Sequence, residues 1–204
     1  MAVKQIKAKT KNREATEERL ILAAKQIFSK YGFNGATTRM IAKKADINVA
    51  LITRYFDGKY GLFIKVLEFK HREVVEAVLP YTQKETITEE CLAYAYYKLQ
   101  FYMQDLNFFK IVMAQFLTDP KFLKKFQETL LTFDNFTTFE NRMKYHIDKG
   151  TLSKDVKLQS VFDDIETQVF GLVIGEVLIR GEKEEEIKNR LRTFITQYCK
   201  SLEK

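Results

Sequence analysis

The sequence predicts an all-α protein, and its composition and periodicity both support this fold class. Helix-breaking residues are scarce, because the 204 residues include only 8 Gly and 2 Pro. Apolar residues recur at three- and four-residue spacing along most of the chain, as on one face of a helix. Sandwich and barrel folds need many turns, so such a composition argues against them.

The first predicted helix covers residues 16–31. Gly32 is expected to end it, because a helix commonly stops at a glycine in the left-handed conformation. The apolar face of this helix is formed by Leu20, Ala23, Ala24, Ile27 and Phe28.

Two short helices and a tight turn follow. Thr37 is a suitable N-cap for the second helix, and Asn48 for a third helix over residues 49–56. The turn between them covers residues 45–48. Ile47, Ile52 and Phe56 are expected to reach the core. The positions expected to face outward are Asn48, Val49, Leu51, Thr53, Arg54 and Tyr55.

A longer helical body is predicted after Gly58. Its first helix, residues 59–79, is terminated by Pro80. The 119–149 helix is long enough to kink near Asp134 and Asn135. The later helices are predicted near residues 86–104, 106–117, 119–149, 156–180 and 184–202.

The positive charge lies almost entirely in the N-terminal third. Residues 1–70 carry 15 Lys and Arg against 6 Asp and Glu, a net charge of +9, whereas residues 71–204 have a net charge of −2. A basic region suits binding to a polyanion, although charge alone fits a solvated basic face equally well. Its coincidence with two short helices joined by a tight turn favours duplex DNA, because the second helix of such a pair can enter the major groove.

Residues 1–13 hold five cationic side chains and no acid, which predicts a flexible basic arm. Such an arm is either a solubilising tail or a segment that lies along phosphates or in the minor groove.

Catalytic and metal-binding patterns are missing from the sequence. Cys91 and Cys199 have no C-x-x-C partner, and His71 and His146 have no metal-ligand spacing, so we expect reduced core thiols and neither metal nor cofactor. There is no paired-carboxylate, Ser/His/Asp or glycine-rich phosphate motif, and we therefore predict that the protein is not an enzyme. No apolar run is long enough for a signal peptide or a membrane span, which predicts a cytoplasmic protein.

Three segments then carry a resemblance: AAKQIFSKYGFNGATTRMIAKKADI, NVALITRYF and DGKYGLF. Over residues 15–65 the chain resembles the tetracycline-repressor (TetR) family of transcriptional regulators. The matching positions are Ala23-Ala24, Phe28, Gly32-Phe33, Thr37, Ile41-Ala42, Tyr55-Phe56 and Lys59. The chain departs from the family pattern at Asp46, where glycine is common, at Val49 to Leu51, at Thr53, where tyrosine is common, and at Tyr60.

The resemblance implies a one-component repressor that binds an operator in double-stranded DNA and leaves it when a small ligand binds. It implies a homodimer formed through the last two long helices, near residues 156–180 and 184–202. Three parts are therefore expected: a basic arm over residues 1–13, a helix-turn-helix DNA-binding domain over 14–58, and a helical effector-binding and dimerisation domain over 59–204.

The DNA contacts are expected from both sides of the turn. Hydroxyl and cationic groups at helix ends suit phosphates, and Asn48, Val49, Leu51 and Arg54 are candidates for base contacts. Lys44 lies next to the predicted contacts. The predicted DNA-binding residues are Thr37, Thr38, Arg39, Lys43, Asn48, Val49, Leu51, Thr53, Arg54, Tyr55 and Lys59.

Aromatic residues are concentrated in residues 81–139, which hold 14 of the 27 Phe and Tyr. Each one alone is better explained by core packing, but as a group they indicate an apolar cavity for a small hydrophobic effector. The predicted lining residues are Phe101, Met103, Phe109, Met113, Phe116, Phe126 and Phe170.

The apolar stripe over residues 158–179 is wider than one core needs, which favours a second buried face and hence a subunit interface. Two alternatives remain open from the sequence. One is an architectural DNA-binding protein without an effector, and the other is a membrane-surface protein that uses the basic arm.

Overall fold

The structure is a computed structural model that describes the backbone of residues 2–75, 79–129 and 136–202. Side chains are described for residues 12–70, 79–128 and 136–202. Within these ranges the ordered elements are helices, which confirms the predicted all-α class. None of the described helices is both long and apolar enough to cross a membrane.

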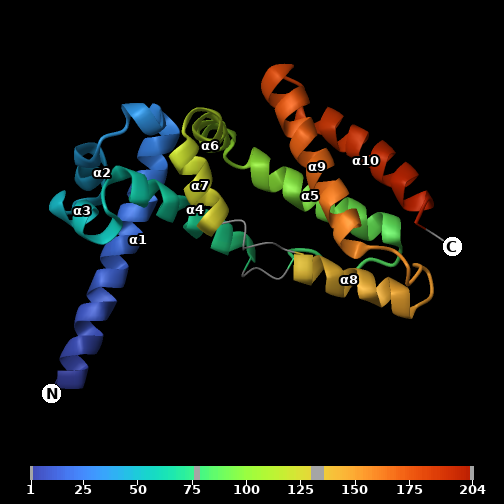
Figure 1. Cartoon of the computed structure of the whole chain (residues 1–204), viewed down its shortest axis with the longest axis horizontal. Helices are drawn as coiled ribbons and strands as arrows, with labels where there is room; N and C mark the ends of the chain where they lie inside the picture. The colour runs from blue at the N-terminus through green and yellow to red at the C-terminus, as the bar shows by residue number, and fades with distance from the viewer. Residues whose placement is uncertain (1, 76–78, 130–135, 203–204) are drawn as a thin grey trace. The chain divides into compact units, whose positions relative to one another are not determined.

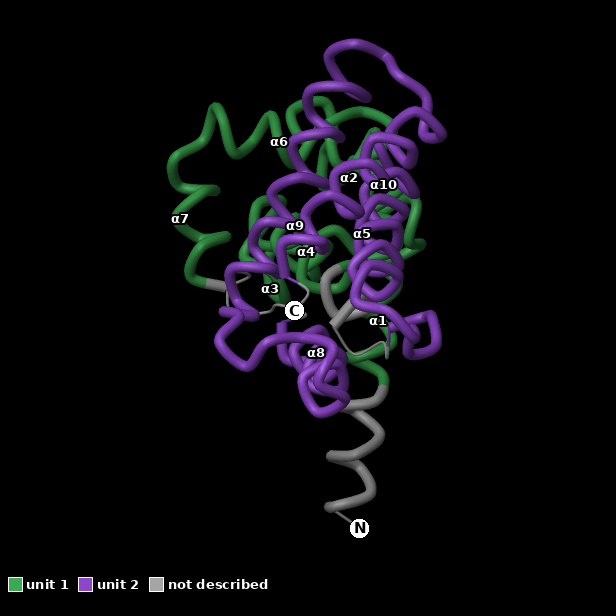
Figure 2. The backbone as a smooth tube through the Cα atoms, turned by 90° about the vertical axis from the view of Figure 1, so that its right-hand side faces the viewer, with its two compact units in different colours: residues 1–74, 107–133 green, residues 75–106, 134–204 purple. Residues whose placement is uncertain are grey.

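The chain divides into two compact units, which Figure 2 shows in different colours. Unit 1 comprises Met1–Val74 and Asn107–Phe133, and unit 2 comprises Val75–Leu106 and Asp134–Lys204. This division differs from the expected boundary after residue 58, because a later stretch of the chain groups with the N-terminal helices. The chain consequently passes between the units at three places.

Unit 1 is built from the first four helices and two helices of the later stretch (Figure 1). Thr37 marks a helix start as predicted, since α2 begins directly after it, and α7 begins at Pro120, close to the start predicted at residue 119. The elements are α1 (Ala2–Gly35), α2 (Thr38–Ala45), α3 (Ala50–Phe56), α4 (Lys59–Val75), α6 (Leu106–Thr118) and α7 (Pro120–Thr129).

The flexible arm expected over residues 1–13 is not a separate segment, because α1 begins at Ala2 and continues through it. Gly32 interrupts α1 as predicted: its φ is 70° and its ψ 171°. A left-handed φ costs a glycine little, because no Cβ meets the backbone. The first helix therefore has its break where the sequence places it, but it starts about four turns earlier than expected.

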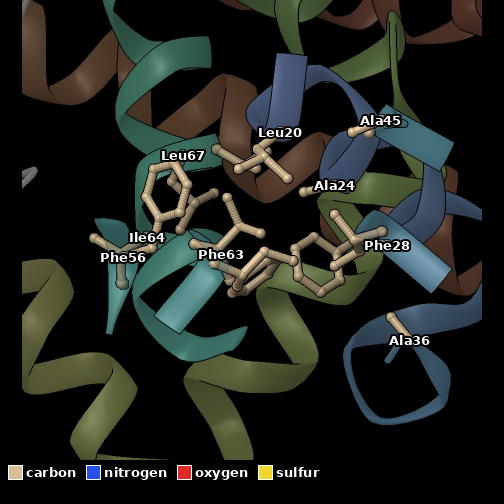
Figure 3. Packing of buried hydrophobic residues seen from close by; sticks show 14 of the residues in the cluster. Leu20, Ala24, Phe28, Ala36, Ala45, Phe56, Phe63, Ile64 and Leu67 are labelled. Carbon is tan, nitrogen blue, oxygen red and sulfur yellow. The ribbon is translucent and has the colours of Figure 1, made fainter. Parts of the chain in front are cut away.

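The core of unit 1 explains why α6 and α7 belong to it. Phe63 of α4 is completely buried, and its ring lies 4.9 Å from that of Phe28, 5.8 Å from Phe108 and 5.4 Å from Phe122. Figure 3 shows Phe63 among side chains of α1 and α4, including Leu20. Aromatic rings at these separations contribute to stability beyond the apolar area they bury.

Unit 2 is centred on α5. A capping box starts this helix, since the Thr86 side chain accepts from the Glu89 backbone and the Glu89 carboxylate accepts from Thr86. Tyr94 is completely buried, with its ring 5.0 Å from Phe139 and 5.6 Å from Phe162. The elements are α5 (Ile87–Met103), α8 (Phe136–Asp148), α9 (Leu158–Leu172), the π-helical segment η1 (Val173–Ile179) and α10 (Glu184–Lys200), and α8, α9 and α10 all pack against α5.

The single helix predicted over residues 119–149 appears as two described segments, α7 and α8. Pro120 provides a good first residue for α7, and Asp119 Oδ1 accepts from the backbone N–H groups of Lys121 and Phe122 at 2.9 and 3.1 Å. The kink considered near Asp134 and Asn135 lies outside the described residues. Because α7 belongs to unit 1 and α8 to unit 2, the chain crosses between the units in this interval.

The wide apolar stripe of α9 and η1 is used mostly within its own unit. Ile165, Val169 and Val173 are completely buried there. Two large apolar side chains remain exposed, Phe170 at 36% and Ile179 at 76% of full exposure. The part of the stripe that a second subunit would still have to cover is therefore much narrower than the sequence suggests.

Candidate nucleic-acid interface

Helix α2 begins with a side-chain cap. Thr37 has extended backbone geometry, and its Oγ1 accepts from the backbone N–H of Met40 at 3.2 Å. This hydrogen bond satisfies one of the orphan donors at the helix start. Because Thr37 is exposed and its hydroxyl proton is not used by the cap, the hydroxyl can still donate to an acceptor in solution.

The turn after α2 depends on one residue in a left-handed conformation. Asp46 has φ 53° and ψ 53°, a geometry that Asp adopts more readily than most residues. Arg19 of α1 holds the same turn, because its Nη2 donates to Ala45 O at 2.6 Å and to Asp46 O at 3.4 Å. Arg19 was not among the residues predicted to matter. The fold brings its cation to the C-terminal end of α2, where carbonyls are unpaired. This contact joins residues 26 positions apart, so no local sequence pattern marks Arg19.

Helix α3 is capped from the turn and stopped sharply. Asn48 Oδ1 accepts from the backbone N–H of Ala50 at 2.9 Å, which agrees with its expected role as a cap. Asp57 has φ 58° and ends the helix. Gly61 in α4 was also missed: a methyl group there would lie 1.7 Å from Phe56 O. Only glycine allows the start of α4 to approach the end of α3 this closely.

The outer face of α3 is open to solvent. Asn48, Val49, Thr53 and Arg54 are all exposed, as is Ala50, which was not among the predicted contacts. Within the described chain Arg54 makes no hydrogen bond or ion pair, so its guanidinium group is available for an outside partner. Short capped helices with an exposed outer face can present side chains at defined positions.

Two of the expected outward residues on α3 face differently. Leu51 and Tyr55 are half-buried and pack against the core of unit 1. Arg13 lies over the Tyr55 ring, with its guanidinium carbon 5.0 Å from the ring centre. A helix of seven residues cannot turn every side chain outward, and the core takes these two in addition to the buried Ile52 and Phe56.

Lys59 has a different partner from the one expected. Its Nζ donates to Phe33 O at 2.8 Å and to Ala36 O at 3.1 Å, and it lies 4.5 Å from the centre of the Phe33 ring. Burial lowers the pKa of Lys59. The ammonium group therefore ties the start of α4 to the end of α1 and to the residue that follows it. Carbonyl groups at a helix end lack helical partners and can accept these hydrogen bonds. Two of its three N–H donors therefore already have backbone acceptors, and its expected role as a phosphate ligand stays a prediction.

The other exposed cations of the interface come from α2. Arg39, Lys43 and Lys44 are exposed, and Thr38, the first residue of the helix, is half-buried. Lys43 and Lys44 occupy the last turn, where the helix dipole favours a cation. With Thr37 and Thr53, the hydroxyl and cationic groups lie on both sides of the turn.

The seven residues predicted to line one effector cavity are divided between the two units. Phe109, Met113, Phe116 and Phe126 belong to unit 1, while Phe101, Met103 and Phe170 belong to unit 2.

The structure does not gather these seven residues into one hydrophobic site. Phe116 and Phe126 pack against the core of unit 1, with ring centres 4.6 Å apart. Of the seven, Met103 borders the cavity of unit 2 described below. The aromatic side chains that suggested one cavity are therefore divided between two separate units.

Together the capped α2, the left-handed turn and the exposed α3 define a helix-turn-helix domain. A family model described as bacterial regulatory proteins of the tetR family matches residues 20–66, which cover this domain. The match is confined to these residues, which resemble the DNA-binding domain of that family.

Two relatives carry the description of HTH-type transcriptional regulators. An HTH-type transcriptional regulator of Bacillus subtilis, YttP, is 26% identical over 125 residues, which are 60% of this chain. The HTH-type transcriptional dual regulator CecR of Shigella flexneri is 37% identical over 71 residues, which are 35% of this chain. The alignments span 60% and 31% of the lengths of these two relatives.

Solved structures share the fold over nearly the whole chain. A TetR-family transcriptional regulator from Mesorhizobium loti superimposes with a TM-score of 0.73 at 15% identity, covering 94% of this chain and 98% of that one. GusR of Salmonella enterica has a TM-score of 0.67 at 15% identity, with 90% and 94% covered. At these identities the likeness shows the fold, an N-terminal helix-turn-helix domain followed by a helical domain.

Proposed function

We propose that this protein is a one-component transcriptional regulator that binds duplex DNA through α3. The observation that carries the proposal is the open outer face of this helix, where Arg54 has no partner among the described residues. Helix caps at Thr37 and Asn48 hold the two short helices at defined ends. A helix presented in this way fits the major groove.

The proposed contacts fall into two classes. Thr37, Thr38, Arg39, Lys43 and Thr53 bind phosphates and set the position of the domain on the duplex. Asn48, Val49 and Arg54 read bases: an Arg fork matches the O6 and N7 acceptors of guanine, and an apolar side chain suits the thymine methyl group. Leu51, Tyr55 and Lys59 support the domain from behind, because their contacts are with unit 1 itself.

A homodimer through α9, η1 and α10 is part of the proposal. The exposed Phe170 and Ile179 support it, since they are the large apolar side chains that unit 2 leaves uncovered on α9 and η1. A two-fold dimer places its two reading helices about one helical repeat of DNA apart. The proposed regulator is a repressor that leaves its operator when a small molecule binds unit 2.

Selection from a random duplex library tests the proposal, because it does not require the operator sequence to be known. We expect the full-length protein to enrich a two-fold symmetric site, and the enriched sequence then serves as the selected duplex. Arg54→Ala should relax the preference at one base position per half-site and weaken binding by about 1–3 kcal/mol. Lys154→Ala removes an exposed cation of unit 2 and is the matched control.

The control variant should enrich the same site with the same affinity as the wild type. If the wild-type protein enriches no sequence, sequence-specific DNA recognition is excluded. If Arg54→Ala keeps every base preference, Arg54 does not read a base.

A further inference from the structure

Unit 2 contains a cavity of about 600 Å³, within the range of small-molecule sites. Its wall comes from three places in the chain: the loop before α5, one face of α5, and the first turns of α10. Tyr81, Lys84, Tyr96, Tyr97, Met103 and Lys188 are the lining residues that decide what it can hold. This is not the hydrophobic site expected from the sequence, because its border contains cations, amides, phenols and the carboxylate of Glu184.

The loop that forms one wall is held in place from behind. Glu90, completely buried in α5, accepts the backbone N–H of Lys84 at 2.8 Å through its Oε2. Arg142 of α8 donates from Nη2 to Tyr81 O at 2.7 Å, and its guanidinium carbon lies 5.0 Å from the centre of the Tyr81 ring. These charge-assisted hydrogen bonds hold the wall in place before any ligand arrives.

Aromatic rings provide the apolar surface of the cavity. Tyr81, Tyr96 and Tyr97 all border it. The Tyr96 hydroxyl is held at the α10 side, since it donates to Lys188 O at 3.3 Å and accepts from Arg192 Nε at 3.4 Å. Phenol rings on two walls favour a planar aromatic ligand, because ring faces and edges pack well against one another.

The charges at the border are unequally matched. Lys188 already pairs with Glu184 at 2.9 Å and with Glu185 at 3.1 Å. Lys84 makes no ion pair with an acid in the part of the chain that the structure describes, and its Nζ stands 6.0 Å from the centre of the Tyr81 ring. One cation beside the tyrosines is therefore left for a single negative group on the ligand.

We propose that this cavity is the effector site and that its ligand is a planar aromatic carboxylate. The rings pack against the tyrosines, and the carboxylate pairs with Lys84. A highly charged ligand does not fit, because Lys84 is the one cation of the described lining that has no acidic partner. The proposal rests on the proposed function, since it names the effector class of the regulator.

The position of the cavity in the chain gives it a means of control. Tyr81 and Lys84 follow the point after Val74 where the chain leaves unit 1, and Met103 precedes its return at Asn107. A ligand in the cavity therefore restrains two of the three connections to the DNA-binding unit. Restraint of connecting segments changes the balance between arrangements of two units whenever the ligand prefers one of them.

Calorimetric titration of the full-length protein with 2-naphthoate tests the site, with neutral 2-naphthylmethanol as the matched probe. We expect naphthoate to bind at least about tenfold more tightly than the alcohol, a difference of about 1.4 kcal/mol. Lys84→Met should remove this preference, and Lys84→Arg should keep it. Lys154→Met removes an exposed cation of the same unit away from the cavity and should change nothing.

Ala93→Trp fills the cavity and should abolish binding of both probes. Thermal melting shows whether each variant folds, and the Lys84 pair keeps the test decisive if Ala93→Trp does not fold. Equal affinity for the two probes, unchanged preference in Lys84→Met, or no binding by the wild type overturns the proposed site.

Binding to the selected duplex separates this inference from the proposed function. We expect saturating 2-naphthoate to change the affinity of wild-type protein for that duplex at least about fivefold, and to leave the affinity of Lys84→Met unchanged. If saturating naphthoate leaves the affinity for the selected duplex unchanged, the effector site is overturned while the DNA-binding function stands. Failure to bind any duplex, with naphthoate still bound, overturns the DNA-binding function alone.

Discussion

Units 1 and 2 use their polar groups in opposite ways. In unit 1 the polar side chains of α2 and α3 face solvent, and Arg19 and Lys59 bind backbone carbonyls at the ends of helices. In unit 2, Glu90 and His146 are completely buried: Glu90 pairs with Arg142 at 3.7 Å, and His146 Nε2 lies 3.5 Å from Gln83 Nε2. The comparison teaches that unit 1 leaves polar groups on α2 and α3 for an outside partner, whereas unit 2 buries polar groups in pairs within its own core.

The largest expected effect tests the boundary between the units. Phe63→Ala should destabilise unit 1 by about 3–5 kcal/mol, because the ring is buried among four others and its removal leaves a cavity. Hydrogen exchange should then accelerate in α6 and α7 along with α1 and α4. Phe139→Ala, an equally buried control, should accelerate exchange in α5 instead.

If α6 and α7 keep their protection in Phe63→Ala, they do not share the core of unit 1. That result would restore the boundary after residue 58 that the sequence predicts.

Lys59 provides the second test, since a phosphate contact and a structural contact make different predictions for it. Lys59→Met should lower the stability of unit 1 by about 2–3 kcal/mol, because it removes two charge-assisted hydrogen bonds to backbone carbonyls. The salt dependence of binding to the selected duplex should stay the same. Urea unfolding and a salt titration measure the two quantities.

Lys110→Met on α6 of the same unit removes an exposed cation and should cost less than about 1 kcal/mol. A loss of about one unit in the salt slope for Lys59→Met would return Lys59 to the phosphate contacts.

A buried imidazole predicts a pH dependence for the stability of unit 2. Burial, and then the charge of Lys149, lower the pKa of His146 below its ordinary value of 6.5. As pH falls below 6.5, the unfolded chain therefore takes up the proton first, and the stability of unit 2 should fall. The slope is at most about 1.4 kcal/mol per pH unit.

His146→Gln should remove this component between pH 6.5 and 5, as measured by unfolding at several pH values. Glu90 and Arg142 stay unchanged in the variant, so the difference between the two proteins isolates the imidazole. Identical pH profiles would mean that His146 does not titrate differently on folding.

The smallest effect concerns a cap. Thr37→Ala should cost about 1 kcal/mol of stability, because the N–H of Met40 loses its acceptor. Thr137→Ala, exposed near the start of α8, is the control and should be close to neutral in thermal unfolding. If both variants lose the same free energy of unfolding, the Thr37 side chain does not stabilise the start of α2 as a cap.

The parts of unit 1 that follow local rules were predictable. Gly32, Thr37 and Asn48 act at the helix ends where their residue types place them. The direction of Lys59 was not predictable, because its carbonyl partners lie 23 and 26 residues earlier in the chain. Gly61 was missed for a related reason: its need for a missing Cβ arises only when α3 and α4 meet.

The contacts of unit 2 were harder to predict from the sequence. The aromatic-rich stretch did predict buried rings, yet the pattern did not show that Phe116 and Phe101 would join different units. Likewise, nothing local marks Lys84 and Lys188 as neighbours of one cavity. The apolar stripe on α9 indicated a subunit interface, but most of it is buried within unit 2, and the interface stays a prediction.

Hydrogen exchange of the full-length protein with and without the selected duplex tests the central claim most directly. The account predicts slower exchange for the amides of residues 37–56, with the strongest protection in α3. If the duplex binds and protection appears only in unit 2, or nowhere in α2 and α3, α3 is not the helix that enters the groove.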